Sequence, residues 1–272
     1  MRTLFSCLAF AVLLANPPLA GNAAAADTLR VGGTGSAIGM LQQVGAVFSA
    51  ATGVTVEVVP NLGSTGAVGA LRDGWLDIAI PARPLKPDEA AAGLRQVVVL
   101  RTAYVIATSH SNPNGLKSAD LAGIFAAEKP AWADGTPIRI ILRPRSDTDT
   151  ALLAELFPGM AAAIETARRR AEVPTAATDQ DNATMAERTP DSLTGTTITQ
   201  LKTEHRNLYI VPLDGIEPTL ANFESGAYRF AKHLYFIVPR ASSAEAQQFL
   251  AFLQSPRGVK ALHETETLPG AE

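Results

Sequence analysis

Residues 28–53 have the sequence TLRVGGTGSAIGMLQQVGAVFSAATG. Residues 28–31 predict a β-strand, a glycine-rich loop follows, and the apolar spacing of residues 36–50 predicts a helix. Gly53 stands where a helix commonly ends in a left-handed residue. A strand, a glycine loop and a helix in this order form the building unit of an α/β fold.

The same alternation continues outward from this unit. We expect further helices at residues 64–73, 118–126, 147–157, 160–171, 179–188 and 244–254. We expect strands at residues 54–59, 78–80, 138–142, 208–211 and 233–238, and one or two strands within 96–108. Strands that alternate with helices predict an α/β architecture with mainly parallel sheets.

Composition narrows the class of protein. The 272 residues are 47% hydrophobic and 18% charged, which excludes a disordered chain and leaves ample material for a core. A net charge of −3 provides no basic surface, so we expect no nucleic-acid partner. The single cysteine, Cys7, excludes a disulfide framework. The four histidines lack metal-ligand spacing, so we expect no metal and no other cofactor.

Residues 1–26, MRTLFSCLAFAVLLANPPLAGNAAAA, predict a secretory signal peptide. One arginine precedes a short apolar run, and a proline pair and small residues follow, as at a signal cleavage site. The run is shorter than the roughly 20 residues that span a bilayer. Cys7 lies inside the apolar run, so it cannot be the lipid-bearing cysteine of a lipoprotein. We expect an exported protein, located in the periplasm and without a membrane anchor.

Three junctions between a strand or loop and a helix share one composition. They contain Gly32-Gly33-Thr34-Gly35-Ser36, Gly63-Ser64-Thr65-Gly66 and Arg143-Pro144-Arg145-Ser146-Asp147-Thr148. The first N–H groups of a helix have no partner within the helix and lie at the positive end of its dipole. Glycine allows close approach of the backbone, and hydroxyls add donors. Each junction alone suits a simple helix cap, whereas three that converge would surround a tetrahedral oxyanion.

Two arginines strengthen this hypothesis. Arg143 falls at the carboxyl end of a predicted strand, where ligands of open α/β sheets bind. Its guanidinium could hold an oxyanion through two parallel hydrogen bonds. Arg83 follows the strand at residues 78–80 in the same way, although a surface arginine in a proline turn explains it equally well.

The chain resembles the phosphate-binding protein family of ABC transporters, which has the type II periplasmic binding fold. The resemblance follows the motifs in order along the region after residue 26: GTGS at 33–36, GSTGA at 63–67, DIAIPARPL at 77–85 and RPRSDT at 143–148. Residues 189–195 (TPDSLTG) are similar to a late turn of the family, and residues 213–228 are similar to the segment before the last strand of its first domain.

The resemblance implies a binding site formed from both lobes. Thr34, Gly35 and Ser36 would donate from the first lobe together with Ser64 and Thr65, and Arg143, Ser146 and Thr148 would close from the second. The family commonly has Ser-Gly-Thr where this chain has Ser146-Asp147-Thr148. It often has Ser-Asp or Ser-Ser before the Pro-Leu, where this chain has Ala82-Arg83.

Because Ala82-Arg83 replaces the Ser-Asp pair, the chain lacks a carboxylate that would bear on selectivity between phosphate and sulfate. A carboxylate accepts a hydrogen bond from protonated phosphate but repels fully ionised sulfate. We expect Asp147 to take this role; the alternative is an aspartate at the first turn of a helix that points to solvent.

The implied architecture is α/β with two lobes, a ligand cleft between them and a two-segment hinge. We expect lobe one at residues 27–105 and 212–272 and lobe two at 106–211, with crossings near residues 101–109 and 208–213. Such a protein, expected to be a monomer and not an enzyme, would close around inorganic phosphate and deliver it to an inner-membrane ABC permease.

Three alternatives stay open from the sequence. The same fold could hold molybdate or sulfate, or it could present phosphate to a sensor instead of a permease. A dinucleotide-dependent enzyme is the remote alternative, because Gly33, Gly35 and Gly39 loosely match a nucleotide fingerprint. Pro60-Asn61 stands where that fingerprint needs an acidic residue. Neither the serine-hydrolase elbow nor the P-loop motif is present.

Overall fold

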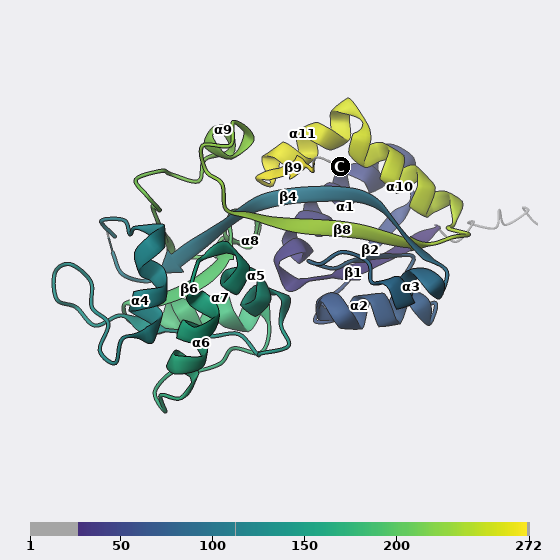
Figure 1. Cartoon of the computed structure of the whole chain (residues 1–272). Coiled ribbons are helices and arrows are strands. Elements are labelled where there is room, and N and C mark those ends of the chain that lie inside the picture. The colour runs from purple at the N-terminus through teal and green to yellow at the C-terminus, as the bar shows by residue number, and fades with distance from the viewer. Residues whose placement is uncertain (1–26, 112, 271–272) are drawn as a thin grey trace, which may run out of the picture.

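The computed structural model describes residues 27–111 and 113–270, and the predicted signal at residues 1–26, which includes Cys7, lies outside them. Two long strands, β4 (Leu94–Thr108) and β8 (Ala231–Pro239), pair antiparallel and run from one half of the molecule to the other (Figure 1). Further strands and helices gather around each end of this pair. The fold is therefore a mixed α/β fold built on two shared strands.

The first half surrounds three parallel strands. Strands β2, β1 and β3 lie in this order, and β3 pairs antiparallel with β8. Helices pack on both faces, and a short strand pairs with β4. The elements of this half are β1 (Thr28–Gly33), η1 (Gly35–Ala37), α1 (Ile38–Thr52), β2 (Thr55–Val59), α2 (Gly63–Arg72), β3 (Ile78–Ile80), α3 (Pro87–Ala91), α10 (Ala244–Gln254), α11 (Pro256–Glu264) and β9 (Thr267–Pro269).

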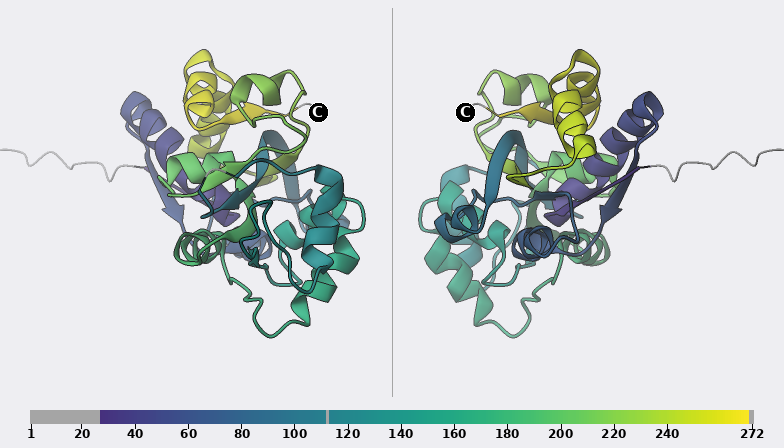
Figure 2. Two further views of the ribbon diagram at one scale, coloured as in Figure 1. Left: turned by 90° about the vertical axis from the view of Figure 1, so that its left-hand side faces the viewer. Right: turned by 90° about the vertical axis from the view of Figure 1, so that its right-hand side faces the viewer.

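The second half forms around the far end of β4, where β6 and β7 pair with it antiparallel. Its helices, coloured teal to green, lie around these strands, as the two side views show (Figure 2). The elements of this half are η2 (Ser118–Asp120), α4 (Leu121–Ala126), β5 (Arg139–Ile140), α5 (Thr148–Leu156), α6 (Met160–Arg168), α7 (Asp179–Arg188), β6 (Ser192–Thr197), α8 (Ile198–Thr203), β7 (Tyr209–Val211) and α9 (Leu220–Glu224).

Each half has its own apolar core. In the first half Phe48 of α1 contacts Phe249 of α10 edge to face, with 5.1 Å between ring centroids. In the second half Phe157 packs against Phe230, with 4.9 Å between centroids. Apolar burial is the dominant favourable term in folding, so two cores define two units that the β4–β8 pair connects.

The position of the second crossing follows from packing. Side chains of residues 213–230, among them Leu213, Phe223 and Tyr228, lie in the core of the second half. The chain then returns to the first half along β8. The predicted lobe boundaries at 105/106 and 211/212 stay a prediction, and this packing favours a second boundary near Ala231.

The expectation of mainly parallel sheets is wrong. Among the strands of the described chain, parallel pairs are limited to β1–β2, β1–β3 and β5–β6, whereas β4 pairs antiparallel with β6, β7, β8 and β9. The physical reason is that the chain crosses out along β4 and back along β8, so the two crossings run in opposite directions. Alternation of strands and helices in the sequence does not reveal this return.

Strand β6 is a second correction, because its first residues were expected to form a turn. All six residues of SLTGTT are buried. The hydroxyl of Thr194 donates to Asn182 Oδ1 at 2.8 Å, and that of Thr196 donates to Gln200 Oε1 at 2.8 Å. Paired hydroxyls can be buried at low cost, and β-branched threonine suits a strand. The short elements α3, α8, α9, α11 and β9 were also not predicted.

Candidate ligand-binding site

The first predicted junction closes on the neighbouring strand. After β1 ends, the N–H of Thr34 donates to the carbonyl of Ile80 at 2.9 Å, so this loop is tied to β3. The hydroxyls of Thr34 and Ser36 lie 3.4 Å apart, and both side chains are buried. Gly35 begins the helical turn that leads into α1, and its N–H group faces Asp179. The junction thus presents the N–H of Gly35 toward the second half.

The second junction forms the first turn of α2. Ser64 is buried, and its Oγ accepts a hydrogen bond from the N–H of Ala82 at 2.9 Å. Thr65, on the same turn, is exposed. Gly63 has φ of 63°, a left-handed conformation that glycine adopts without strain. Only Ser64 of this pair therefore lies at the junction between the halves.

The third junction meets the second directly. Asp147 caps α5, and its Oδ1 accepts from the N–H of Asp149 at 2.8 Å. Thr148 begins the helix, and its Oγ1 lies 3.3 Å from Ser64 Oγ. Residues 84 positions apart in the chain are brought into hydrogen-bond range by this contact. The second and third junctions therefore meet across the two halves.

Arg143 is buried at the same place. Its Nη1 donates to the carbonyl of Ala176 at 2.9 Å, and its Nη2 donates to Asp147 Oδ2 at 2.7 Å. Its Nε is buried without a hydrogen-bond partner among the described residues. Asp147 is thus neither free nor directed only to solvent: it caps a helix and pairs with Arg143.

Two predicted site residues do not join this cluster. The guanidinium of Arg83 pairs with both carboxylate oxygens of Glu89, at 2.9 and 2.6 Å, and lowers the pKa of that carboxyl. The structure thus places Arg83 in a local ion pair that caps α3. Ser146 is exposed in the turn before Asp147.

Sequence reasoning missed three charged residues that lie at the centre of the junction. Lys232 of β8 is fully buried and forms ion pairs with Asp149 and with Asp179, the latter at 3.7 Å. Asp179 also lies 3.9 Å from Arg143 Nη2. A lysine within an apolar strand was a signal that could have been used, because a buried lysine requires an anionic partner.

The electrostatics of this cluster are tightly balanced. Burial raises the pKa of Asp149 to about 6, against the opposing effect of Lys232. Burial also acts to raise the pKa of Asp179, but Lys232 and Arg143 outweigh it and the pKa is lowered. The two aspartates in turn raise the pKa of Lys232 despite its burial. With Asp147 included, three carboxylates face two cations.

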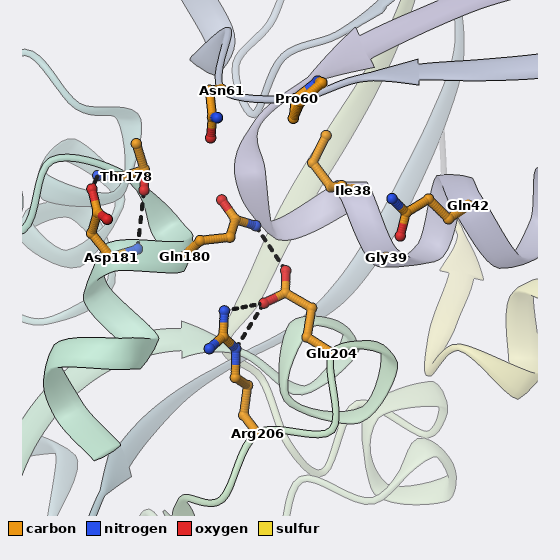
Figure 3. A pocket seen from close by; sticks show the side chains of 10 residues that line it. All are labelled: Ile38, Gly39, Gln42, Pro60, Asn61, Thr178, Gln180, Asp181, Glu204 and Arg206. Carbon is orange, nitrogen blue, oxygen red and sulfur yellow. Dashed lines mark hydrogen bonds and ion pairs between the residues drawn. The ribbon is translucent and has the colours of Figure 1, made fainter. Parts of the chain in front are cut away.

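An open pocket of about 710 Å³ lies next to the first turn of α7, the helix that begins with Asp179 (Figure 3). One wall comes from the first half, through α1 and the segment before α2, and the other from the start of α7 and the segment that follows α8. Gln180 Nε2 donates to the carbonyl of Gly35 at 2.9 Å and to Glu204 Oε1 at 2.7 Å. The lining residues are Ile38, Gly39, Gln42, Pro60, Asn61, Thr178, Gln180, Asp181, Glu204 and Arg206.

Within residues 27–111 and 113–270, no group of three or more histidine, cysteine, aspartate or glutamate side chains is arranged to hold a metal ion. None of the helices in those ranges combines the length and apolarity needed to cross a bilayer.

Comparison with known proteins places this geometry in context. A family model described as a PBP superfamily domain matches residues 19–257. No curated protein matches the chain significantly by sequence.

Solved structures share the fold. A Clostridium perfringens protein provisionally assigned as a phosphate ABC transporter substrate-binding protein, solved with bound phosphate, aligns with a TM-score of 0.75 and 16% identity over 90% of this chain and 100% of its own. An ABC-type phosphate transport receptor from Vibrio cholerae gives 0.60 and 15%, over 89% and 99%. The periplasmic molybdate-binding protein of Azotobacter vinelandii gives 0.62 and 13%, over 89% and 100%.

Proposed function

The chain belongs to the PBP superfamily, and on that premise we propose that it is an exported solute-binding protein that captures inorganic phosphate between two lobes. The lobes correspond to the two halves described above. The observation that carries the proposal is the meeting of helix starts from both halves, with Ser64 Oγ 3.3 Å from Thr148 Oγ1 and Arg143 buried beside them. Helix N-termini and a guanidinium are the donors that proteins use for oxyanions.

The proposed ligand contacts come from both lobes. Donors from the first lobe are the N–H groups and hydroxyls of Thr34, Gly35, Ser36 and Ser64. Donors from the second lobe are Arg143 and Thr148. The exposed residues Thr65 and Ser146 are left out of this set. Arg83 is left out of this set because Glu89 already occupies its guanidinium.

The acidic residues of the cluster favour phosphate over other oxyanions. Phosphate carries a proton at neutral pH and can donate it to a carboxylate such as Asp147, whereas sulfate and molybdate have no proton to give. A carboxylate next to a fully ionised oxyanion adds repulsion that no hydrogen bond offsets. Asp147, which lies in contact with Arg143, is placed to make this distinction.

The proposed mechanism is closure of the lobes about the β4–β8 pair, followed by recognition of the closed form by an ABC permease. The protein acts by binding and not by catalysis, as a monomer in the periplasm. The structures solved with phosphate-transport assignments support this role through the fold. A sensor that uses the same cleft would share the ligand and differ in the partner.

Calorimetric titration tests the ligand. Protein freed of bound ligand by unfolding and refolding is titrated with phosphate, sulfate and molybdate at pH 7.5. We expect phosphate to bind with a dissociation constant of micromolar or less and excess sulfate to leave that binding unchanged. Preference for sulfate or molybdate would overturn the ligand and keep the fold, and absence of any oxyanion binding would overturn the function.

A further inference from the structure

We propose that Asp179 limits the affinity of the site and sharpens its selectivity, because its carboxylate competes with the bound oxyanion for the same donors. The inference rests on the proposed function, since it concerns the same site. It assigns a specificity-determining role to a residue outside the set of ligand contacts named above.

The contacts of Asp179 are those expected of a bound anion. The residue is the first of α7 and is 7% exposed. The N–H of Gly35, which belongs to the first half, faces the carboxylate of Asp179 and helps to lower its pKa. The carboxylate also lies 3.9 Å from Arg143 Nη2 in the second half and 3.7 Å from Lys232 Nζ on the connecting strand. One carboxylate thus gathers a backbone donor, a guanidinium and an ammonium group.

The backbone of Gly35 is shaped for this approach. A Cβ atom at Gly35 would lie 2.6 Å from Asp179 Oδ2, closer than side-chain carbons are found to other atoms. Gln180, the next residue of α7, donates to the carbonyl of the same glycine at 2.9 Å. The first turn of α7 therefore holds Gly35 at both its N–H and its C=O, and only glycine leaves room for it.

Charge explains why this contact opposes the ligand. An oxyanion that takes the N–H of Gly35 and the guanidinium of Arg143 must approach Asp179, and like charges brought together cost several kcal/mol. Protonated phosphate can relieve the cost by donating a hydrogen bond, and sulfate cannot. Asp149 remains as a partner of Lys232 when Asp179 is neutralised, so the buried lysine keeps an anion.

The test compares Asp179→Asn with the wild-type protein by calorimetric titration of phosphate and of sulfate at pH 7.5. We expect the variant to bind sulfate about 10- to 100-fold more tightly, which corresponds to roughly 1.4 to 2.8 kcal/mol. Phosphate should gain less, so the ratio of the two affinities falls. Glu245→Gln is the control: it removes a carboxylate from the first turn of another helix, α10, at a residue with no ion pair to Arg143 or Lys232 among the described residues, and should leave the ratio unchanged.

The outcomes separate the two proposals. Phosphate binding by the wild type with no gain for Asp179→Asn overturns the role of Asp179 and leaves the proposed function in place. Oxyanion binding by the variant alone supports competition by Asp179 and overturns phosphate capture by the wild type. Absence of binding in both proteins overturns both. Circular dichroism checks the fold, and Asp179→Ser serves as the second neutral variant if the amide variant is unfolded.

Discussion

Lys232, Asp149 and Asp179 are buried charged side chains, and each is stabilised by the opposite charge beside it. Removing one partner of a buried ion pair typically destabilises a protein by about 3–5 kcal/mol, because the other charge is left uncompensated. Here one ammonium serves two carboxylates, with Asp149 fully buried beside it. Protonation of Asp149 is therefore the change that most directly removes a buried negative charge from the cluster.

The stability of the protein should consequently contain a pH-dependent contribution from Asp149. Its pKa is about 6 in the folded protein and near the ordinary 3.8 when unfolded, because burial disfavours the charged form. The folded state then holds this proton more tightly, so the stabilisation is complete below pH 3.8 and is lost as the pH rises through about 6. Urea unfolding at a series of pH values measures it.

The control for this prediction is Asp149→Asn, which cannot titrate. We expect the free energy of unfolding of the wild type to fall relative to the variant between pH 4 and pH 7. Parallel curves for the two proteins across that range would contradict the raised pKa.

At the scale of secondary-structure elements, the helix starts were predictable and their charged neighbours were not. Glycine and hydroxyl residues before apolar periodicity indicate where α1, α2 and α5 begin, because capping is local chemistry. Burial of Lys232 depends on which elements meet, and β8 meets α5 and α7 only through the tertiary fold. Strand β6 was not predicted for the same reason, because its threonines form hydrogen bonds with residues of α7 and α8 that only the tertiary fold brings close. Local signals thus predicted the donors, and long-range packing determined the carboxylates around them.

The first turn of α2 offers a test at this scale. Ser64→Ala removes the acceptor of the Ala82 N–H and the hydroxyl that faces Thr148. A hydrogen bond to a charged group contributes about 1.5–3 kcal/mol, so phosphate affinity should fall at least about tenfold. Titration calorimetry measures the loss.

Thr219→Ala is the comparison for Ser64→Ala, because it removes the side-chain cap of α9, away from the junction. It should lower the melting temperature slightly and leave phosphate affinity unchanged. Equal phosphate affinity in Ser64→Ala and wild type would remove this helix start from the site.

At the scale of the whole molecule, the contact between Ser64 and Thr148 joins the two halves across the cleft. The chain contains one cysteine, Cys7, so a designed pair of cysteines has little competition. Ser64→Cys combined with Thr148→Cys should form a disulfide under mild oxidation, since the two side-chain oxygens are 3.3 Å apart. The crosslinked protein should release bound phosphate more slowly than the reduced form of the same variant, as stopped-flow dilution before and after reduction would measure.

The matched pair is Thr65→Cys with Thr148→Cys, in which the first position is exposed on the same helix turn. This pair should remain reduced under the same conditions, as thiol titration would show. Equal crosslinking of both pairs would indicate that the halves move widely, and an uncrosslinked Ser64/Thr148 pair would contradict the closed contact.

The return of the chain along β8 has a consequence for the order in which the protein can acquire its structure during synthesis. The core of the first half combines β1 and α1 with β8, α10 and α11. Residues near position 30 therefore cannot be fully buried until residues beyond 231 have been synthesised. The core of the second half is formed almost entirely from residues 103–230. A chain that emerges from its N-terminus can therefore complete the middle unit first, while the core around its earliest strands stays incomplete until β8, α10 and α11 are made.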